Sequence, residues 1–218
     1  GCAVVIRNTV REAHETYEAV KSVFGREQVT LLHSRFLAAE RAARDRRMLE
    51  LFGKDNQRRP FRHVVVATQV IEQSLDVDFD LMLTDPAPMD LVLQRIGRLH
   101  RHDRAERPHG LRDARCLVIV EDTNAVPWSY SRSTDHVYAR YAVLRTLGII
   151  ADRGEILVRE PLDYAELTTL AYADGVPVGR TQWHEAFDAA LEKRDKARAQ
   201  AQAKATTWCL GEDNTPSC

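Results

Sequence analysis

The residues best suited to chemistry are three polar side chains in the segment 94–101. Gln94, Arg98 and Arg101 fall within one narrow sector if this segment is helical, and its apolar residues fall on the opposite sector. Two guanidinium groups directed at one place suit a polyanion such as a phosphate group, because each donates parallel hydrogen bonds and keeps its charge. A helix that ended at Gly97 would instead place both arginines on a loop. An exposed charge cluster that pairs with nearby acidic residues is the competing interpretation.

A second set of polar residues follows the hydrophobic runs of the chain. Thr68 comes directly after the run VVVA, Asp85 comes after LMLT, and Ser34 and Arg35 come after LLH. Because ligands of parallel α/β sheets bind outside the carboxyl ends of the strands, we expect a site to be built there. Ser34 and Thr68 suit capping or turn roles equally well, and Arg35 suits simple solvation.

The order of short hydrophobic runs and helical patterns predicts the fold class. Runs at 3–6, 28–32, 63–67 and 80–83 read as strands, and helical patterns lie between them, which is typical of an α/β fold with a parallel sheet flanked by helices.

Thr9 and Glu12 predict a capping box for a helix that ends near Gly25. The inward stripe of this helix is expected to be Val10, Ala13, Tyr17, Val20 and Phe24. A second helix is expected over 37–52, with Ala38, Ala42, Leu49 and Phe52 facing inward and its arginines facing outward.

The C-terminal half has a looser pattern. We expect one strand at 116–120 and helices around 134–147, after Pro161, and from Trp183 to about 205. The last helix begins amphipathically and then becomes rich in Ala and charged residues, so it suits a connector between domains, with a disordered end as the alternative. The sequence therefore predicts a domain over 1–125, followed by a mostly helical extension over 126–218.

Composition excludes several classes of protein. The 218 residues carry a formal net charge of −1, and no apolar stretch approaches the ~18 residues that a membrane-spanning helix needs. The start has neither a signal peptide nor an initiating Met, so we expect a piece of a longer protein. The four cysteines and the histidines show no metal-ligand spacing, so no metal site or disulfide is predicted, and a reducing cytoplasm fits best.

The basic residues are unevenly distributed. Between Arg35 and Arg62 the sequence has nine Lys or Arg residues and four acidic residues. A patch of this kind attracts phosphate groups, and a solvated arginine-rich helix and loop is the equally weighted alternative.

Three motifs in order resemble those of superfamily-two helicases. QRIGRLHRH (94–102) resembles the sixth signature motif of the second RecA-like lobe, ATQVIEQSLDVDFD (67–80) the fifth, and LLHSRF (31–36) the fourth-motif region. The residues that follow Gly-Arg, Leu-His-Arg-His, are most similar to those of the CRISPR-associated helicase-nucleases of type I systems. The resemblance covers roughly residues 1–110, and it implies a RecA-like sheet.

The resemblance implies a role for each matching residue at the nucleotide. Arg98 and Arg101 would act as arginine fingers on the γ-phosphate of ATP, and Gln94 would orient the attacking water or the phosphate. Asp76 would accept a hydrogen bond from the ribose, although a plain turn carboxylate is the alternative.

The resemblance also implies contacts with nucleic acid and with other proteins. Thr68, Ser34 and Arg35 would contact the backbone of single-stranded DNA, and Asn8 and Thr9 occupy a position near the same track. An RNA-guided CRISPR surveillance complex would recruit the full protein to its DNA.

The chain lacks half of an ATPase site. No phosphate-binding loop of the form G-x-x-x-x-G-K-[ST] and no D-E-x-x box is present, so the first RecA-like lobe would supply the loop and the Mg²⁺ ligands for ATP. We therefore expect this piece alone neither to hydrolyse ATP nor to unwind DNA. Two alternatives remain: a lobe of another DNA or RNA helicase of the superfamily, and a non-catalytic nucleic-acid-binding module.

Overall fold

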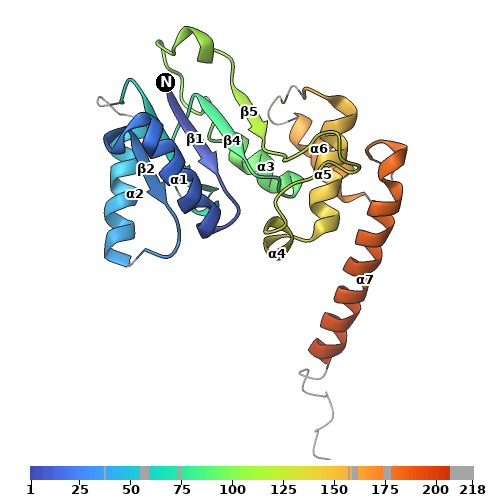
Figure 1. The fold of residues 1–218 in the computed structure, drawn as a ribbon. Coiled ribbons are helices and arrows are strands. Elements are labelled where there is room, and N and C mark those ends of the chain that lie inside the picture. Colours follow the sequence, from blue (N-terminus) through green and yellow to red (C-terminus); the bar gives the residue numbers. More distant parts are fainter. Residues whose placement is uncertain are drawn as a thin grey trace, which may run out of the picture.

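The core of the molecule is a parallel sheet of five strands (Figure 1). The computed structural model describes residues 1–36, 38–54, 59–72, 75–156, 158, 162–173 and 178–206. The strands are β1 (Cys2–Ile6), β2 (Val29–Leu32), β3 (His63–Ala67), β4 (Leu81–Thr84) and β5 (Arg115–Val118), in the spatial order β2-β3-β1-β4-β5. Every pairing between neighbours is parallel. The predicted α/β class is confirmed, and the predicted strands agree to within about two residues at each end.

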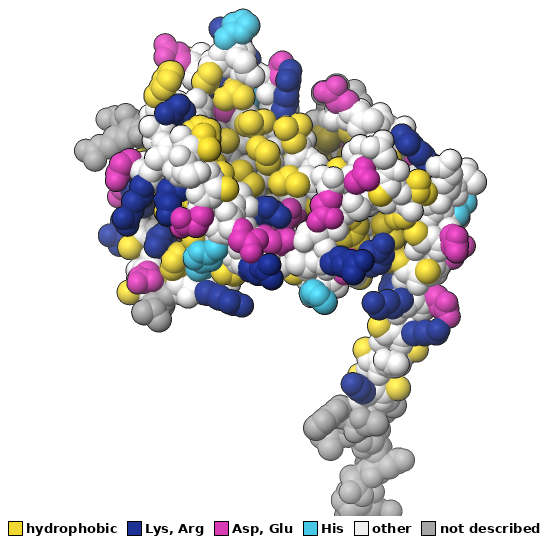
Figure 2. Space-filling model, in the orientation of Figure 1, with side chains coloured by type: hydrophobic (Ala, Val, Ile, Leu, Met, Phe, Trp, Pro, Cys, Tyr) yellow, Lys and Arg dark blue, Asp and Glu magenta, His cyan; other side chains and the backbone are white. Residues whose placement is uncertain are grey.

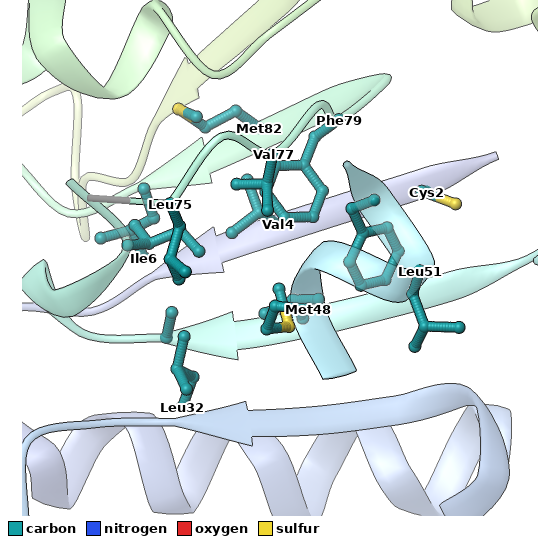
Figure 3. Close-up of a cluster of buried hydrophobic side chains, with 14 of the residues drawn as sticks. Cys2, Val4, Ile6, Leu32, Met48, Leu51, Leu75, Val77, Phe79 and Met82 are labelled. Atoms are coloured by element: carbon teal, nitrogen blue, oxygen red, sulfur yellow. The ribbon is translucent and has the colours of Figure 1, made fainter. Parts of the chain in front are cut away.

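Helices cover the two faces of the sheet. Helix α1 (Val10–Phe24) packs on one face through Ala13, which lies in a buried cluster with β-strand residues such as Val5 and Val66. Helix α2 (Ala38–Phe52) packs on the other face, where its buried side chains share a cluster with residues of β1, β3 and the segment 75–82 (Figure 3). Consecutive strand residues therefore enter opposite cores, which explains why the strands are continuous apolar runs.

The start of α1 agrees with its predicted cap. The Thr9 hydroxyl oxygen accepts a hydrogen bond from the backbone N–H of Glu12 at 3.2 Å, and the hydroxyl donates to the Glu12 carboxylate at 2.6 Å. Glycine follows the last turn, and the N–H of Gly25 donates to the carbonyl of Lys21. Both predicted ends of the helix are thus confirmed.

The inward face of α2 differs from the predicted one. Met48, Leu51 and Phe52 are buried, whereas Ala42 and Leu49 are exposed, so the inward assignment of those two residues was wrong. The inward prediction for Phe52 is confirmed, and Met48 and Leu51 join it in i, i+3, i+4 spacing in place of Leu49. Alanine carries little hydrophobic signal, and the predicted stripe relied on it. The side chain predicted inward at position 38 lies outside the described part of the structure.

The C-terminal extension packs against the lobe. It contains helices α4 (Thr134–Val137), α5 (Arg140–Arg153), α6 (Leu162–Tyr172) and α7 (His184–Thr206). Met89 and Leu93 of helix α3 (Met89–Ile96) share a buried cluster with residues of α5, α6 and α7. The first turns of α7 dock through Phe187 and Ala190, and Figure 1 shows the rest of the helix projecting away from the body.

The helix predicted around 134–147 is divided in two. Tyr138 adopts an extended backbone with φ −127° and ψ 151°, which ends α4, and Ala139 then caps α5. The Tyr138 hydroxyl lies 3.0 Å from a guanidinium nitrogen of Arg95 in α3. The break therefore lets a side chain of the extension reach into the lobe. No helix in the described part of the chain is long and apolar enough to cross a membrane.

A buried ionic network closes the amino end of the sheet. Asp78 and Asp80 precede β4 and are completely or almost completely buried, and Arg59, Arg104 and Arg107 surround them. Burial acts to raise the pKa of Asp80, but the N–H of Cys2 and the Arg59 guanidinium outweigh it and lower that pKa. The network joins segments that are far apart in the sequence.

Replacing Asp78 with alanine should lower the free energy of unfolding by about 3–5 kcal/mol, because buried guanidinium groups would lose their partner. Urea titration of the purified chain, followed by circular dichroism, measures this. Asp113→Ala is the matched control, since it removes an exposed ion pair with Arg115 and should change little. Equal losses for the two variants would contradict a stabilising role for the network.

Candidate nucleotide and nucleic-acid site

Arg98 and Arg101 lie on a loop, because α3 ends at Ile96 and Gly97 caps it. The Phe79 N–H donates to the carbonyl of Arg98 at 2.9 Å, and the His100 N–H donates to the carbonyl of Phe79 at 3.0 Å. Phe79 lies just before the start of β4, so the loop lies near the amino end of that strand. Gln94, Arg98 and Arg101 therefore do not share one face of a helix. The two arginines also lie away from the carboxyl edge of the sheet.

Arg101 and Asp76 form an exposed pair. Their Nε and Oδ1 atoms are 2.5 Å apart, and Arg101 also donates to the carbonyl of Gly97 at 3.2 Å. The hydrogen bond from Arg101 is the main cause that lowers the pKa of Asp76. The side chain of His102 approaches the same carboxylate at 3.4 Å. The structure thus brings together two residues, Asp76 and Arg101, that the motifs assigned to the nucleotide.

Arg98 is half-buried and only partly satisfied. Its Nη2 donates to the carbonyl of Glu72 at 3.1 Å, whereas its Nε is buried without a hydrogen-bond partner in the described structure. A neighbouring ring nitrogen, His100 Nε2, is also buried without a hydrogen-bond partner in the described structure. Buried polar atoms are almost always paired, so unpaired nitrogens on one loop are consistent with an anionic group supplied from outside this lobe. The donor set therefore fits a nucleotide phosphate.

Gln94 lies one turn before these residues. It is exposed on α3, and its side chain has no hydrogen bond in the described structure. Gln94 is consequently free to meet a ligand or a neighbouring lobe, and it is separated from Arg98 by the end of the helix.

Arg95 is the most connected arginine of the motif, and the sequence interpretation missed it. It is fully buried, with Nε 2.7 Å from the carboxylate of Glu72 and Nη1 2.6 Å from the hydroxyl of Thr84. Its other contacts are the carbonyl of Asp85, the side-chain oxygen of Asn8 and the hydroxyl of Tyr138. Arg95 stands three residues after Val92 and four before Leu99. This spacing puts it on the apolar face of the segment, and its burial could have been predicted from that position.

The residues predicted to contact nucleic acid lie at the carboxyl edge. Thr68 follows β3, is 3% exposed, and donates its N–H to the carbonyl of Leu32 at 3.0 Å. Ser34 and Arg35 follow β2 in an exposed turn, where the Arg35 N–H lies 3.2 Å from His33 Nδ1. In this conformation Ser34 and Arg35 present their side chains to solvent, whereas Thr68 is enclosed.

A short 3₁₀ helix connects the two groups of residues. This helix, η2 (Gln69–Glu72), begins where the Ile71 N–H donates to the carbonyl of Thr68. At its other end Glu72 accepts from Arg95 through its carboxylate and from Arg98 through its carbonyl. The carboxyl edge and the loop at 97–102, called the arginine loop from here on, are thus joined by one turn of backbone.

The described residues contain no group of three or more His, Cys, Asp or Glu side chains placed to hold a metal ion.

Cys2 and Cys116 are free thiols, and burial is the main cause that raises the pKa of each, to about 12 for Cys116. His33 lies 3.0 Å from His14, and burial lowers the pKa of His33. A packed histidine of this kind belongs to the core of the lobe.

Comparison with known proteins identifies the lobe. The family model described as CRISPR-associated nuclease/helicase Cas3, C-terminal, matches residues 1–104. Residues 1–104 belong to the Cas3 C-terminal family. The family resemblance drawn from the three motifs is thereby confirmed. The matched segment includes every residue predicted for the site.

The similarity extends beyond the matched segment. The CRISPR-associated nuclease/helicase Cas3 of Streptococcus thermophilus is 36% identical over 201 residues, which cover 91% of this chain and 21% of that protein. The chain therefore spans about a fifth of the length of this curated relative.

Solved structures agree with the fold. A crystal structure of a CRISPR-associated protein has a TM-score of 0.84 and 38% identity, covering 94% of this chain and 23% of its own. T. fusca Cas3 with AMPPNP has a TM-score of 0.76 and 36% identity, covering 91% and 23%. A further similar chain comes from a structure of a CRISPR RNA-guided surveillance complex, pre-nicking. The RecA-like class expected from the motifs is confirmed.

Two arginines of the motif should respond differently to substitution. Arg95→Gln should lower the free energy of unfolding by about 3–5 kcal/mol, because Glu72 would stay buried without its charge partner. Arg98→Gln removes one hydrogen bond to a carbonyl and should have a much smaller effect. Urea unfolding of both variants measures the difference. A loss of stability for Arg98→Gln as large as that for Arg95→Gln would contradict the distinction.

The chain should lose stability on mild acidification. Burial is the main cause that lowers the pKa values of His33, His63 and His100 from 6.5. The unfolded chain then binds more protons, so their contribution is complete above that value and is lost as the pH falls through the lowered pKa values. The thermal midpoint should be lower at about pH 5.5 than at about pH 7.5, and His33→Gln should reduce the difference. The exposed His109→Gln is the control, and a midpoint that does not fall would contradict the sign.

Proposed function

We propose that this chain is the second motor lobe of a longer, ATP-dependent helicase that moves along single-stranded DNA in CRISPR antiviral defence. The observation that carries the proposal is the loop at 97–102, where Arg98 has a buried donor without a partner in the described structure and Arg101 lies beside Asp76. This loop falls within the segment matched to the Cas3 C-terminal family.

Arg98 and Arg101 would act as arginine fingers on the γ-phosphate of ATP held mainly by the first RecA-like lobe. An inserted arginine neutralises charge that develops in phosphoryl transfer, and its effect on rate is about 10³–10⁵-fold. Arg98 is held by one carbonyl and keeps another donor available. Gln94, exposed beside the loop, would orient the attacking water or the phosphate.

The pair between Arg101 and Asp76 suits a site that changes partners. Both side chains are about half exposed, and an exposed ion pair contributes at most about 1 kcal/mol. A phosphate group could therefore take Arg101 at little cost. Asp76 would then be available to the ribose hydroxyls of the same nucleotide.

Contacts with DNA are assigned to the carboxyl edge. Ser34 and Arg35 are exposed there and would bind backbone phosphates, and Thr68 would join them after a local movement of the edge. Because η2 joins this edge to the arginine loop, closure of the two lobes on ATP would move both groups together. Binding of this kind weakens steeply with salt.

The remaining partners are proposed from relatives. The similar T. fusca Cas3 was crystallised with AMPPNP, which supports ATP as the nucleotide. Mg²⁺ ligands would come from the first lobe of the same chain. A similar chain belongs to the structure of a CRISPR RNA-guided surveillance complex, which supports recruitment by such a complex. A cytoplasmic location is part of the proposal.

Two other functions make different predictions. A helicase of the same superfamily that acts on RNA would use the same loop but respond to a different nucleic acid. A non-catalytic binding module would have no use for a partly unpaired arginine next to an exposed Asp76–Arg101 pair, so the loop favours a motor lobe.

ATP turnover by the full-length protein tests the proposal. Single-stranded DNA should stimulate turnover more than RNA does, and Arg98→Ala should lower the stimulated rate about 10³-fold or more because the transition state loses a charge partner. Arg112→Ala, an exposed arginine near β5, is the matched control and should leave the rate unchanged. Equal rates for wild type and Arg98→Ala would contradict the finger assignment.

The same assay separates the alternatives. Stimulation by RNA in place of DNA would keep the mechanism and change the substrate, and no stimulation would favour the binding module. The isolated 218-residue chain should show no turnover, since it lacks a phosphate-binding loop. Turnover by the isolated chain that Arg98→Ala abolishes would overturn the two-lobe assignment.

A further inference from the structure

We propose that single-stranded nucleic acid continues from Ser34 and Arg35 into a groove along the outer edge of β2. The proposal rests on the proposed function, because it extends the same nucleic-acid track. The groove, named here the β2-edge groove, has a volume of about 490 Å³ and lies between α1 and α2. The residues that matter for its chemistry are Tyr17, Arg26, Glu27, Phe36, Arg44 and Arg47.

The β2-edge groove carries excess positive charge. Arg26, Arg44 and Arg47 line it together with one acid, Glu27. Arg47 has an exposed partner, Glu50, at 3.4 Å, and Arg26 and Arg44 have no carboxylate partner among the described residues. On the side of the molecule where α1 and α2 lie, Figure 2 shows several Lys and Arg side chains with a few Asp and Glu side chains among them. The groove therefore attracts phosphate groups.

Aromatic rings accompany the charges. Tyr17 of α1 and Phe36, which precedes α2, both line the groove. The Arg44 guanidinium carbon lies 3.8 Å from the centroid of the Phe36 ring, and the His33 ring stacks on Phe36 at 4.0 Å with an interplanar angle of 7°. Arg44 and His33 therefore cover the two faces of the Phe36 ring, so Tyr17 is the ring that a base can meet in the groove. A basic groove with an aromatic ring is a pattern by which proteins hold single strands, because phosphates meet the cations and a base stacks on the ring.

The groove is continuous with the proposed track. Phe36 is two residues from Ser34 in the exposed turn after β2, and its stacking partner His33 directly precedes that turn. His33 also lies 3.0 Å from His14, another residue of the groove wall. A strand that contacts Ser34 and Arg35 would therefore meet the open end of the groove next.

The edge of β2 is poorly suited to a peptide strand. In an added strand the outward carbonyl groups of β2 would accept hydrogen bonds, but the carbonyl of Leu31 already accepts from Arg44 Nη1 at 3.1 Å. The same contact turns Arg44 toward β2, so the prediction that every arginine of α2 faces outward was wrong. The groove therefore offers arginine side chains, while part of the β2 backbone edge is already occupied. This combination favours nucleic acid over a β-strand of another protein as the ligand.

Binding of fluorescent oligodeoxynucleotides of increasing length to the full-length protein tests the inference. The variant Arg26→Gln with Arg47→Gln should bind short oligonucleotides as the wild type does and long ones several-fold more weakly. In a plot of log affinity against log salt concentration, the slope for this variant should be smaller in magnitude than the wild-type slope by about 1.4, because two phosphate contacts disappear. The control, Arg112→Gln with Arg115→Gln, removes the same charge near the opposite edge of the sheet and should match the wild type.

Photocrosslinking gives a second readout. Long oligonucleotides that carry 5-iodouracil should crosslink to Tyr17, as mapped by mass spectrometry, and short ones should not. Wild-type affinity of the double variant at every length, with no crosslink to Tyr17, would overturn the inference and leave the proposed function intact.

The remaining outcomes point elsewhere. Absence of DNA binding by the wild type at any length would refute the proposed function itself. Normal DNA binding by the double variant with weaker association to an RNA-guided surveillance complex would assign the groove to a protein partner, which also overturns the inference.

Discussion

The buried ion pair between Arg95 and Glu72 is the interaction on which the candidate site depends. It joins α3, which leads into the arginine loop, to η2, which leads back to the carboxyl edge of the sheet. With Glu72 fixed by its carboxylate, its carbonyl is directed at Arg98. The extension contributes to the same pair, since the Tyr138 hydroxyl accepts from Arg95 Nη2. Two segments that are far apart in the sequence are therefore positioned by one guanidinium.

A second anchor fixes the other end of the loop. Asp78 and Asp80 flank Phe79, which exchanges two backbone hydrogen bonds with the arginine loop. Because the carboxylates are buried with three arginines, Phe79 has little freedom, and the loop that pairs with it is held as well. The exposed residues Arg101 and Asp76 lie between these anchors. The lobe thus combines rigid supports with side chains that can exchange partners.

The sequence predicted the sheet well and the packing of side chains less well. Continuous apolar runs such as VVVA mark strands buried on both faces, so the strand positions followed directly. Ala42 and Leu49 were placed inward because alanine gives no clear helical phase. The break at Tyr138 was not predicted, and the side chain at the break contacts Arg95, which belongs to a distant segment. The candidate site shows the same division: Arg98 and Arg101 were proposed from their spacing and Asp76 from the family resemblance, whereas Arg95 was overlooked because an arginine is expected to be exposed.

A physical difference separates the two kinds of arginine in this motif. Desolvating a guanidinium costs several kcal/mol, and only a complete set of partners offsets that cost, so an arginine such as Arg95 stays fixed. Arg101 keeps contact with water, and its pair with Asp76 contributes little to stability, so that contact can be exchanged. Arg98 lies between these limits, with one carbonyl bound and one buried donor unpaired in the described structure. An unpaired donor costs about 1–3 kcal/mol, and an anion that approached it would remove this cost on binding. Arg98 thus combines a position beside the rigid support with a donor that is unpaired in the described structure.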